Sequence, residues 1–248
     1  CASEFPNVRS IVVDATVVHE AGGGDVEELA YALATAVSYL RALTERGLEI
    51  GTAANSIGFR FAIGRDLFME AAKLRACRRL WSRATGTCGV AEPERGAPVH
   101  AVTSPRGLAT RDPWVNMLRT TVGSFAAAIG EADTITVLPS DLAVGHPDEL
   151  ARRMATNSQT ILREESHLDH VVDPGGGSWY LEALTDRLRE RLETHGIHTV
   201  QDVLAKTPEE LSSIPGIGPV TAQRMLDMAQ QTLDEALAEI AEAVGGEE

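Results

Sequence analysis

Four short apolar runs, rich in β-branched residues, punctuate the first half of the chain and a little beyond. They lie at residues 9–18, 57–63, 99–103 and 134–138. Runs of this length that are bounded by glycine, proline or polar residues are typical of buried strands. The pattern therefore predicts four strands at these positions.

Between and after these runs, apolar residues recur every three or four positions, which is the helical period. The first periodic segment follows Asp25, which we expect as its N-cap, and stops at Gly47. A later one starts with Asp112 as an expected N-cap and Pro113 in the first turn. The spacing predicts five helices, over residues 26–46, 66–83, 113–130, 147–165 and 180–193.

Strands that alternate with helices of this length indicate an α/β fold built from parallel β/α units. Eight such units close a (β/α)8 barrel of about 250 residues, and this chain supplies about four. An open doubly wound sheet fits the same count. No GxGxxG follows the first strand and no GxxxxGK[ST] occurs, so nucleotide phosphate binding is not indicated. The glycines at 22–24 favour a tight turn over an anion site.

Composition is that of an ordinary globular protein, with 44% hydrophobic and 23% charged residues. The net charge of −14 opposes broad binding to nucleic acid or anionic membranes. No apolar run reaches about 18 residues and no leader is recognisable before residue 30, so we expect a cytoplasmic protein without membrane contact. The three cysteines form no CxxC pair, and we expect no metal site; Cys77 fits a buried core position.

Four long blocks of the sequence carry a family resemblance. They are residues 12–47, with the run HEAGGGDVEELAY; 59–81, with FRFAIGRDLFMEAAKLRAC; 100–141, with HAVTSPRGLATRDPW; and 151–188, with NSQTILREES. In their order and spacing these blocks resemble the substrate-binding barrel of the methylmalonyl-CoA mutase family. The resemblance covers about residues 5–190.

This resemblance implies the second half of a (β/α)8 barrel, because the family's earlier barrel strands have no counterpart here. In the family, the barrel binds an acyl-CoA along its axis and meets adenosylcobalamin, which carries the radical chemistry. The chain has no DxHxxG motif, so no lower cobalamin ligand can be assigned. We therefore expect this chain alone to bind no cofactor, and adenosylcobalamin to belong to the family's catalytic subunit.

The positions that hold catalytic side chains in the family carry other residues here. By the resemblance, Thr16 and Val17 stand in place of a Tyr-His pair, and Pro98 and Ala101 in place of Arg and Ser. Each lost hydrogen bond weakens substrate binding by about 1–3 kcal/mol. We assign no catalytic residue and no metal ligand. The candidates for facing substrate or cofactor are Thr16, Val17, His19, Ala101, Asn157, Gln159 and Glu165.

Within that set, His19 would share a strand face with Val17 if the strand pleat were regular to that point. Asn157, Gln159 and Glu165 match an NTQ…ES block of the family, and we read them first as support for the fold. The pattern is most similar to the non-catalytic small subunit of the heterodimeric bacterial mutase, an isomerase. Four parallel strands would also leave sheet edges open, so we expect either a catalytic mutase subunit or a second copy as partner.

The last 56 residues differ in kind, with 2 basic and 11 acidic residues and no aromatic residue. We place a domain boundary here, with a mutase-like half-barrel over 1–192 and a small all-α module over 193–248. The run Ile214–Gly218 resembles the hairpin of a helix-hairpin-helix module. Its glycines would let backbone amides approach a DNA phosphate. The candidate phosphate contacts are Gly216, Gly218, Thr221 and Arg224.

Two observations limit that DNA reading. Pro219 and Val220 stand where DNA-binding versions of the motif usually have a basic residue, and the segment is strongly acidic. Weak DNA contact and a role in protein interaction therefore both stay open.

Overall fold

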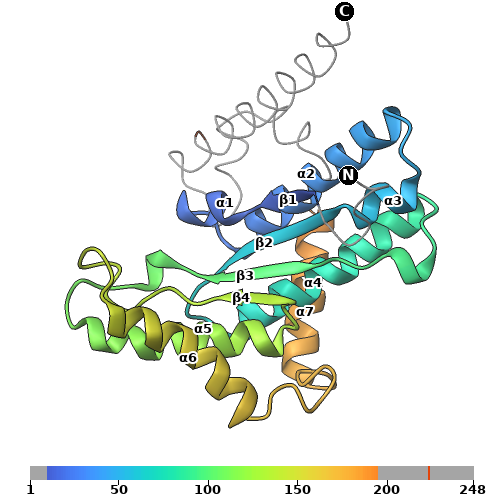
Figure 1. Cartoon of the computed structure of the whole chain (residues 1–248). Helices are drawn as coiled ribbons and strands as arrows, with labels where there is room; N and C mark the ends of the chain where they lie inside the picture. Colours follow the sequence, from blue (N-terminus) through green and yellow to red (C-terminus); the bar gives the residue numbers. More distant parts are fainter. Residues whose placement is uncertain (1–9, 195–222, 224–248) are drawn as a thin grey trace, which may run out of the picture.

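The structure is a computed structural model that describes residues 10–194 and Gln223. Four strands, β1 (Ile11–Asp14), β2 (Ile57–Ile63), β3 (Val99–Thr103) and β4 (Thr134–Thr136), form one parallel sheet in the order β1-β2-β3-β4. Parallel strands in chain order, with helices between them, are the arrangement of half a (β/α)8 barrel. The α/β fold with about four β/α units is therefore confirmed (Figure 1).

The sheet is accompanied by α1 (Thr16–Glu20), α2 (Asp25–Glu45), α3 (Ile50–Asn55), α4 (Leu67–Thr87), α5 (Pro113–Ile129), α6 (Glu149–Glu164) and α7 (Trp179–Thr194). Two short 3-10 turns lie at Glu92–Glu94 and Pro105–Gly107. Five of the helices match the predicted ones, whereas α1 and α3 are too short to show a helical period in the sequence. Among the described helices, none is both long and apolar enough to cross a membrane.

The first predicted strand is wrong in its second half. β1 ends at Asp14, and the β-branched run continues as the helix α1. The Asp14 carboxylate accepts hydrogen bonds from the backbone N–H of Thr16 at 3.0 Å and from its hydroxyl at 2.6 Å. This local pairing turns the chain out of the sheet, an effect that strand propensity does not encode.

The helix ends depart from prediction in two places. Gly24, not Asp25, is the N-cap of α2. Asp112 does precede α5, but it has a left-handed backbone with φ of 56° and its side chain makes no capping hydrogen bond. Gly47 ends the α2 turn with φ of +87°, as its predicted role as a stop requires.

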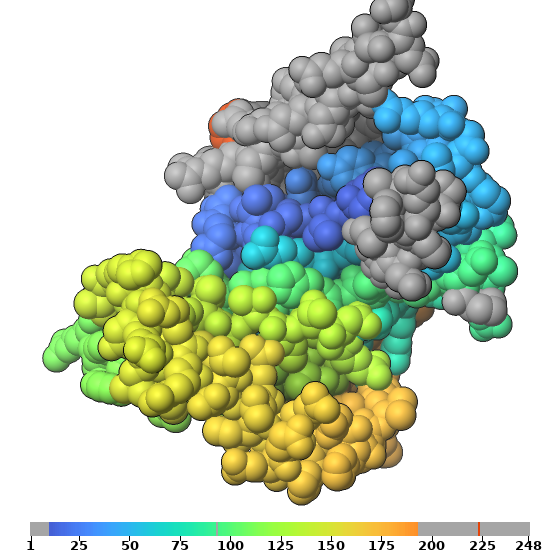
Figure 2. Space-filling model, in the orientation of Figure 1, coloured from blue at the N-terminus to red at the C-terminus, as the bar shows by residue number. Residues whose placement is uncertain are grey.

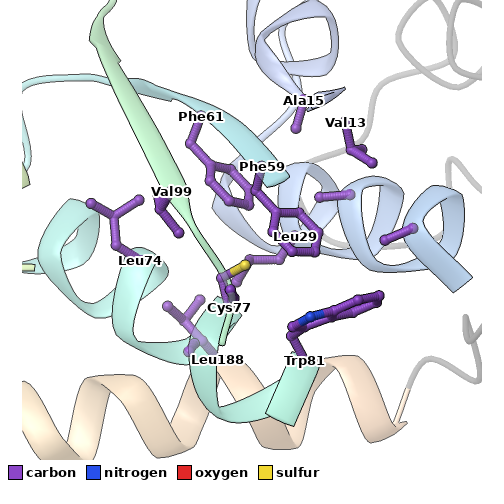
Figure 3. Packing of buried hydrophobic residues seen from close by; sticks show 14 of the residues in the cluster. Val13, Ala15, Leu29, Phe59, Phe61, Leu74, Cys77, Trp81, Val99 and Leu188 are labelled. Atoms are coloured by element: carbon purple, nitrogen blue, oxygen red, sulfur yellow. The ribbon is translucent and has the colours of Figure 1, made fainter. Parts of the chain in front are cut away.

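The core lies between the sheet and the helices. Val13, Phe59, Phe61 and Val99 point toward α2 and α4, where Trp81 meets Phe59 edge to face with ring centroids 5.3 Å apart (Figure 3). Cys77 is fully buried, as predicted, and burial raises the pKa of its thiol well above the usual range. The burial of aliphatic and aromatic side chains on the side of the sheet that faces α2 and α4 is the main source of stability.

Helix α7 closes the outer layer of this core. Leu181, Leu184 and Leu188 are buried, and α7 packs against α4. Arg75 of α4 adds ion pairs with Asp173 and with Glu182, the latter at 2.6 Å. In Figure 1, α4 and α7 lie behind the sheet, so the side that faces the viewer carries neither of them.

Removing the ring at the centre of this core should destabilise the fold strongly. We expect Phe59→Ala to lower the free energy of unfolding by about 3–5 kcal/mol, because Phe59 is 1% exposed and packs on Trp81. Phe68→Ala is the matched control, since Phe68 is 48% exposed and its edge-to-face contact with Tyr180 is worth about 1 kcal/mol. Urea denaturation of both variants measures the difference, and equal losses would contradict this description of the core.

Candidate functional site

Active sites of (β/α)8 barrels lie where the parallel strands end at their carboxyl termini. In this chain, α1 follows β1 at that end, Gly64 follows β2 and Ser104 follows β3. Polar and charged side chains from these connections and from α2 and α4 converge here. We call this group the carboxyl-end cluster; its members are His19, Glu20, Asp25, Glu28, Glu70, Lys73, Ser104 and Arg106.

His19 and Ser104 form the outer part of the cluster. The Nε2 atom of His19 lies 2.7 Å from the Ser104 hydroxyl, and the hydroxyl oxygen accepts a hydrogen bond from the backbone N–H of Arg106 at 3.1 Å. The Arg106 guanidinium donates to the backbone carbonyl of His19. These bonds join the α1 connection to the loop after β3.

Burial, together with the positive charges of Lys73 and Arg106, lowers the pKa of His19 to about 4. His19 is therefore a neutral imidazole at pH 7. Burial also raises the pKa of Glu20, against the opposing effect of Arg106. The surroundings in the outer part of the cluster thus favour the neutral forms of both His19 and Glu20.

Lys73 forms the inner part of the cluster and is fully buried. Its ammonium donates to Glu28 at 2.7 Å and to the backbone carbonyl of Ala62 at 2.8 Å, and it pairs with Glu70 at 2.7 Å and Asp25 at 3.0 Å. Burial alone would lower the pKa of Lys73, but these carboxylates outweigh it and raise the pKa well above its usual value. Lys73 is therefore charged in the folded protein.

The acidic partners of Lys73 also accept hydrogen bonds from backbone amides at the carboxyl end of β2. Glu28 accepts a hydrogen bond from the backbone N–H of Ala62 at 2.8 Å, and Glu70 accepts one from Gly64 at 2.6 Å. Burial raises the pKa of Glu28 to about 7, although Lys73 opposes the rise. The same direction holds for Glu70. The inner cluster connects α2 and α4 to the end of β2.

Two hollows lie near this end of the sheet. Ser104 is 4% exposed, and the hollow beside it measures about 10 Å³, which is room for about one water molecule. A larger hollow of about 180 Å³ lies between the starts of α5 and α6, where Trp114, Met117 and Met154 line it. Neither hollow has the volume of a typical cofactor site.

The residues predicted from the sequence to face substrate or cofactor do not lie together. Thr16, Val17 and His19 lie on α1, so no strand pleat places His19 on the same face as Val17. The Thr16 hydroxyl is bonded to Asp14, and Val17 is 38% exposed. Ala101 is fully buried in the core between β3 and the helices and offers no surface to a ligand.

The remaining barrel candidates lie on the outside of the molecule. Asn157 and Gln159 belong to α6, and Glu165 is the residue that ends it. Asn157 and Glu165 are exposed and Gln159 is half-buried. The helix and the segment after it, yellow to orange in Figure 2, form the lower surface of the molecule in that view. The DNA-contact candidates Gly216, Gly218, Thr221 and Arg224 lie outside the described residues.

Comparison with known proteins bears directly on this arrangement. The family described as methylmalonyl-CoA mutase matches residues 1–203, and a helix-hairpin-helix tandem family matches residues 183–231. The chain belongs to the methylmalonyl-CoA mutase family. Both matches include residues 183–203, so they leave the predicted boundary near residue 192 as a prediction.

Several proteins that are similar to this chain are named as small subunits of the mutase. The methylmalonyl-CoA mutase small subunit of Streptomyces virginiae is 53% identical over 189 residues, covering 76% of this chain and 30% of the relative. The small subunit of Propionibacterium freudenreichii subsp. shermanii is 44% identical over 186 residues, covering 75% of this chain and 29% of the relative. The Escherichia coli methylmalonyl-CoA mutase is 38% identical over 189 residues, covering 76% of this chain and 26% of the relative. The chain thus spans about a third or less of these relatives.

Sequence reasoning missed the inner members of the cluster. Lys73 is one of only two lysines in the chain and stands between the apolar residues Ala72 and Leu74 of α4. A lone lysine in such a position, with Glu70 one turn before it, is the signal that could have indicated a buried ion pair. Nothing in the sequence indicates that Glu28, 45 residues earlier, is its partner.

Neutralising Lys73 should destabilise the fold by leaving buried carboxylates unpaired. We expect Lys73→Met to lower the free energy of unfolding by about 3–5 kcal/mol, and Glu28→Gln in the same chain to restore part of the loss. Arg163→Met is the control, because Arg163 is 70% exposed and its surface pairs contribute at most about 1 kcal/mol. Urea denaturation of the three variants measures these effects, and a Lys73→Met loss no larger than the control would show that the cluster is dispensable.

The protonation of His19 provides a second check. We expect its imidazole to titrate with a pKa of about 4 in the folded protein, as followed by NMR chemical shifts with His19→Gln used to assign the signal. Arg106→Gln should raise that pKa, because it removes a nearby positive charge. An imidazole that titrates near 6.5 in the wild-type chain would contradict the half-buried position of His19 next to Lys73 and Arg106.

Proposed function

We propose that this chain is a structural, non-catalytic component of an adenosylcobalamin-dependent methylmalonyl-CoA mutase assembly. The observation that carries the proposal is the filling of the carboxyl-end cluster by the chain's own groups. His19 is bonded to Ser104, and the Arg106 guanidinium donates to the His19 backbone carbonyl.

The side chains at the family's catalytic positions support the same proposal. The Thr16 hydroxyl donates a hydrogen bond to the Asp14 carboxylate, the side chain of Val17 has no polar group, and Ala101 is buried in the core. The imidazole of His19, which is half-buried, is already bonded to Ser104. The catalytic subunit would therefore bind substrate and cofactor. This chain would support the fold of the complex and provide a surface for contact with the catalytic subunit.

Assembly is the first test of this proposal. We expect the purified chain to form a defined complex with the catalytic subunit of a heterodimeric bacterial mutase, as measured by light scattering before and after mixing. Calorimetric titration of the isolated chain with methylmalonyl-CoA or adenosylcobalamin should give no saturable heat. Saturable binding of either ligand to the isolated chain would contradict the proposal, and so would failure to form the complex.

A substitution separates a structural role from a catalytic one. We expect His19→Gln to leave the mutase rate of the assembled complex within about twofold of wild type, because His19 is bonded internally rather than to substrate. Light scattering on the same sample controls for assembly. A tenfold or larger fall in rate with assembly intact would place His19 in the chemistry and overturn the non-catalytic assignment.

The match to the helix-hairpin-helix family favours a second candidate function. We propose that residues 193–248, which contain most of that match and carry 11 acidic and 2 basic residues, serve as an interaction module for protein rather than DNA. We expect titration of the chain with labelled duplex DNA to show no affinity that falls steeply with salt. Salt-sensitive binding that Gly218→Val abolishes, and the control Gly246→Val does not, would favour DNA instead.

A further inference from the structure

The inner part of the carboxyl-end cluster holds more acid than base. The Lys73 ammonium lies 2.7 Å from Oε2 of Glu28 and 2.7 Å from Oε2 of Glu70. Asp25 also reaches this ammonium, at 3.0 Å, but its side chain is 26% exposed and is partly solvated. The side chains of Glu28 and Glu70 are 0% and 5% exposed. One buried ammonium therefore faces two buried carboxyl groups, and their charges balance when one of the two carries a proton.

The groups around this pair of glutamates do not supply the missing positive charge. The Nδ1 atom of His19 lies 3.8 Å from Glu28, but its imidazole is neutral at pH 7. The Arg106 guanidinium donates to the backbone carbonyl of His19. Burial raises the pKa of the Cys77 thiol, so this neighbour of Glu28 is neutral too. Within the described part of the chain, the titratable and charged groups around the pair are His19, Glu20, Asp25, Lys73, Cys77 and Arg106.

The hydrogen bonds of the two glutamates leave a place for a proton. Both oxygens of Glu28 accept hydrogen bonds, from the backbone N–H of Ala62 at 2.8 Å and from Lys73 at 2.7 Å. Oε1 of Glu70 accepts one from the backbone N–H of Gly64 at 2.6 Å, whereas its buried Oε2 accepts none from the described residues. Burial raises the pKa of both carboxyl groups, that of Glu28 to about 7, and the nearby Glu70 adds to the rise at Glu28.

We propose that the inner cluster is a pH-sensitive junction, in which Glu28 and Glu70 share one proton in the folded chain and its release weakens the contact between α2, α4 and β2. Release leaves two buried carboxylates against one ammonium, which is unfavourable. Glu28 connects α2 to Ala62 and Glu70 connects α4 to Gly64, so the repulsion acts where the three elements meet. This inference stands apart from the proposed mutase assembly, because every group in it belongs to this chain.

The sign of the pH effect follows from where these groups titrate. In the unfolded chain the glutamates ionise near their ordinary pKa of 4.5, whereas burial keeps the pKa of Glu28 at about 7 in the folded chain. The stability that the proton contributes is therefore complete below about pH 4.5 and is lost as the pH rises through about 7. His19 acts in the opposite direction, because its pKa falls from 6.5 to about 4 on folding. Its contribution is lost as the pH falls from about 6.5 to 4, so only single variants separate the two effects.

Urea denaturation of the full chain between pH 5 and pH 8 tests the proposal. Glu28→Gln imitates the protonated carboxyl group, so its folding equilibrium constant relative to wild type should rise by at least about tenfold over this range. The same ratio for His19→Gln should fall over this range. Glu182→Gln is the matched control: hydrogen bonding from Arg79 lowers the pKa of Glu182, so this carboxylate is ionised throughout and the ratio should stay constant.

The side-chain carboxyl carbons of Glu28 and Glu70, followed by NMR in the wild-type chain, provide a measurement that needs no variant to fold. We expect them to report the uptake of one proton by the pair near neutral pH. A folded chain in which both carboxyl groups ionise near pH 4.5 would overturn the proposal. A folded Glu28→Gln chain whose stability relative to wild type is the same at pH 5 and pH 8 would overturn it as well.

Discussion

The described fold depends on one buried cation. Lys73 reaches from α4 into the space beside β2, where an isolated ammonium would be strongly unfavourable. Glu28 of α2 and Glu70 of α4 balance its charge, and both carboxylates also accept backbone hydrogen bonds from the end of β2. One side chain thereby fixes the relative positions of two helices and a strand, and any shift in one of them leaves a buried charge unpaired.

The same cation shapes the end of the sheet at which barrel enzymes place their chemistry. Its charge contributes to the low pKa of His19 and so keeps that imidazole neutral and bonded to Ser104. The groups that could act as acid or base are therefore committed to one another. A carboxyl end that is occupied in this way fits the proposed structural role in an assembly.

The sequence predicted most of the regular elements because their signals are local. The apolar run of β2 and the three- and four-residue spacing of α4 and α5 are readable without any partner. The first strand was predicted too long, because Val17 and Val18 favour a strand while the hydrogen bonds of Asp14 to Thr16 turn the chain into α1. The cluster was missed because its contacts join Glu28 to Lys73 and His19 to Ser104, and such pairings over 45 and 85 residues leave no periodic trace. The family resemblance located the segment but could not show that Ala101 faces the core.

Native-state hydrogen exchange at the amide of Ala62 tests the central role of Lys73 most directly. This N–H donates to Glu28, which Lys73 holds, at the end of β2 where α2 and α4 converge. If the cluster fixes these elements together, the amide of Ala62 exchanges only through global unfolding, with the same free energy as the most protected amides of β2 and β3. Exchange of Ala62 through a local opening, at a free energy well below the global value, would show that the cluster opens independently and would contradict the account.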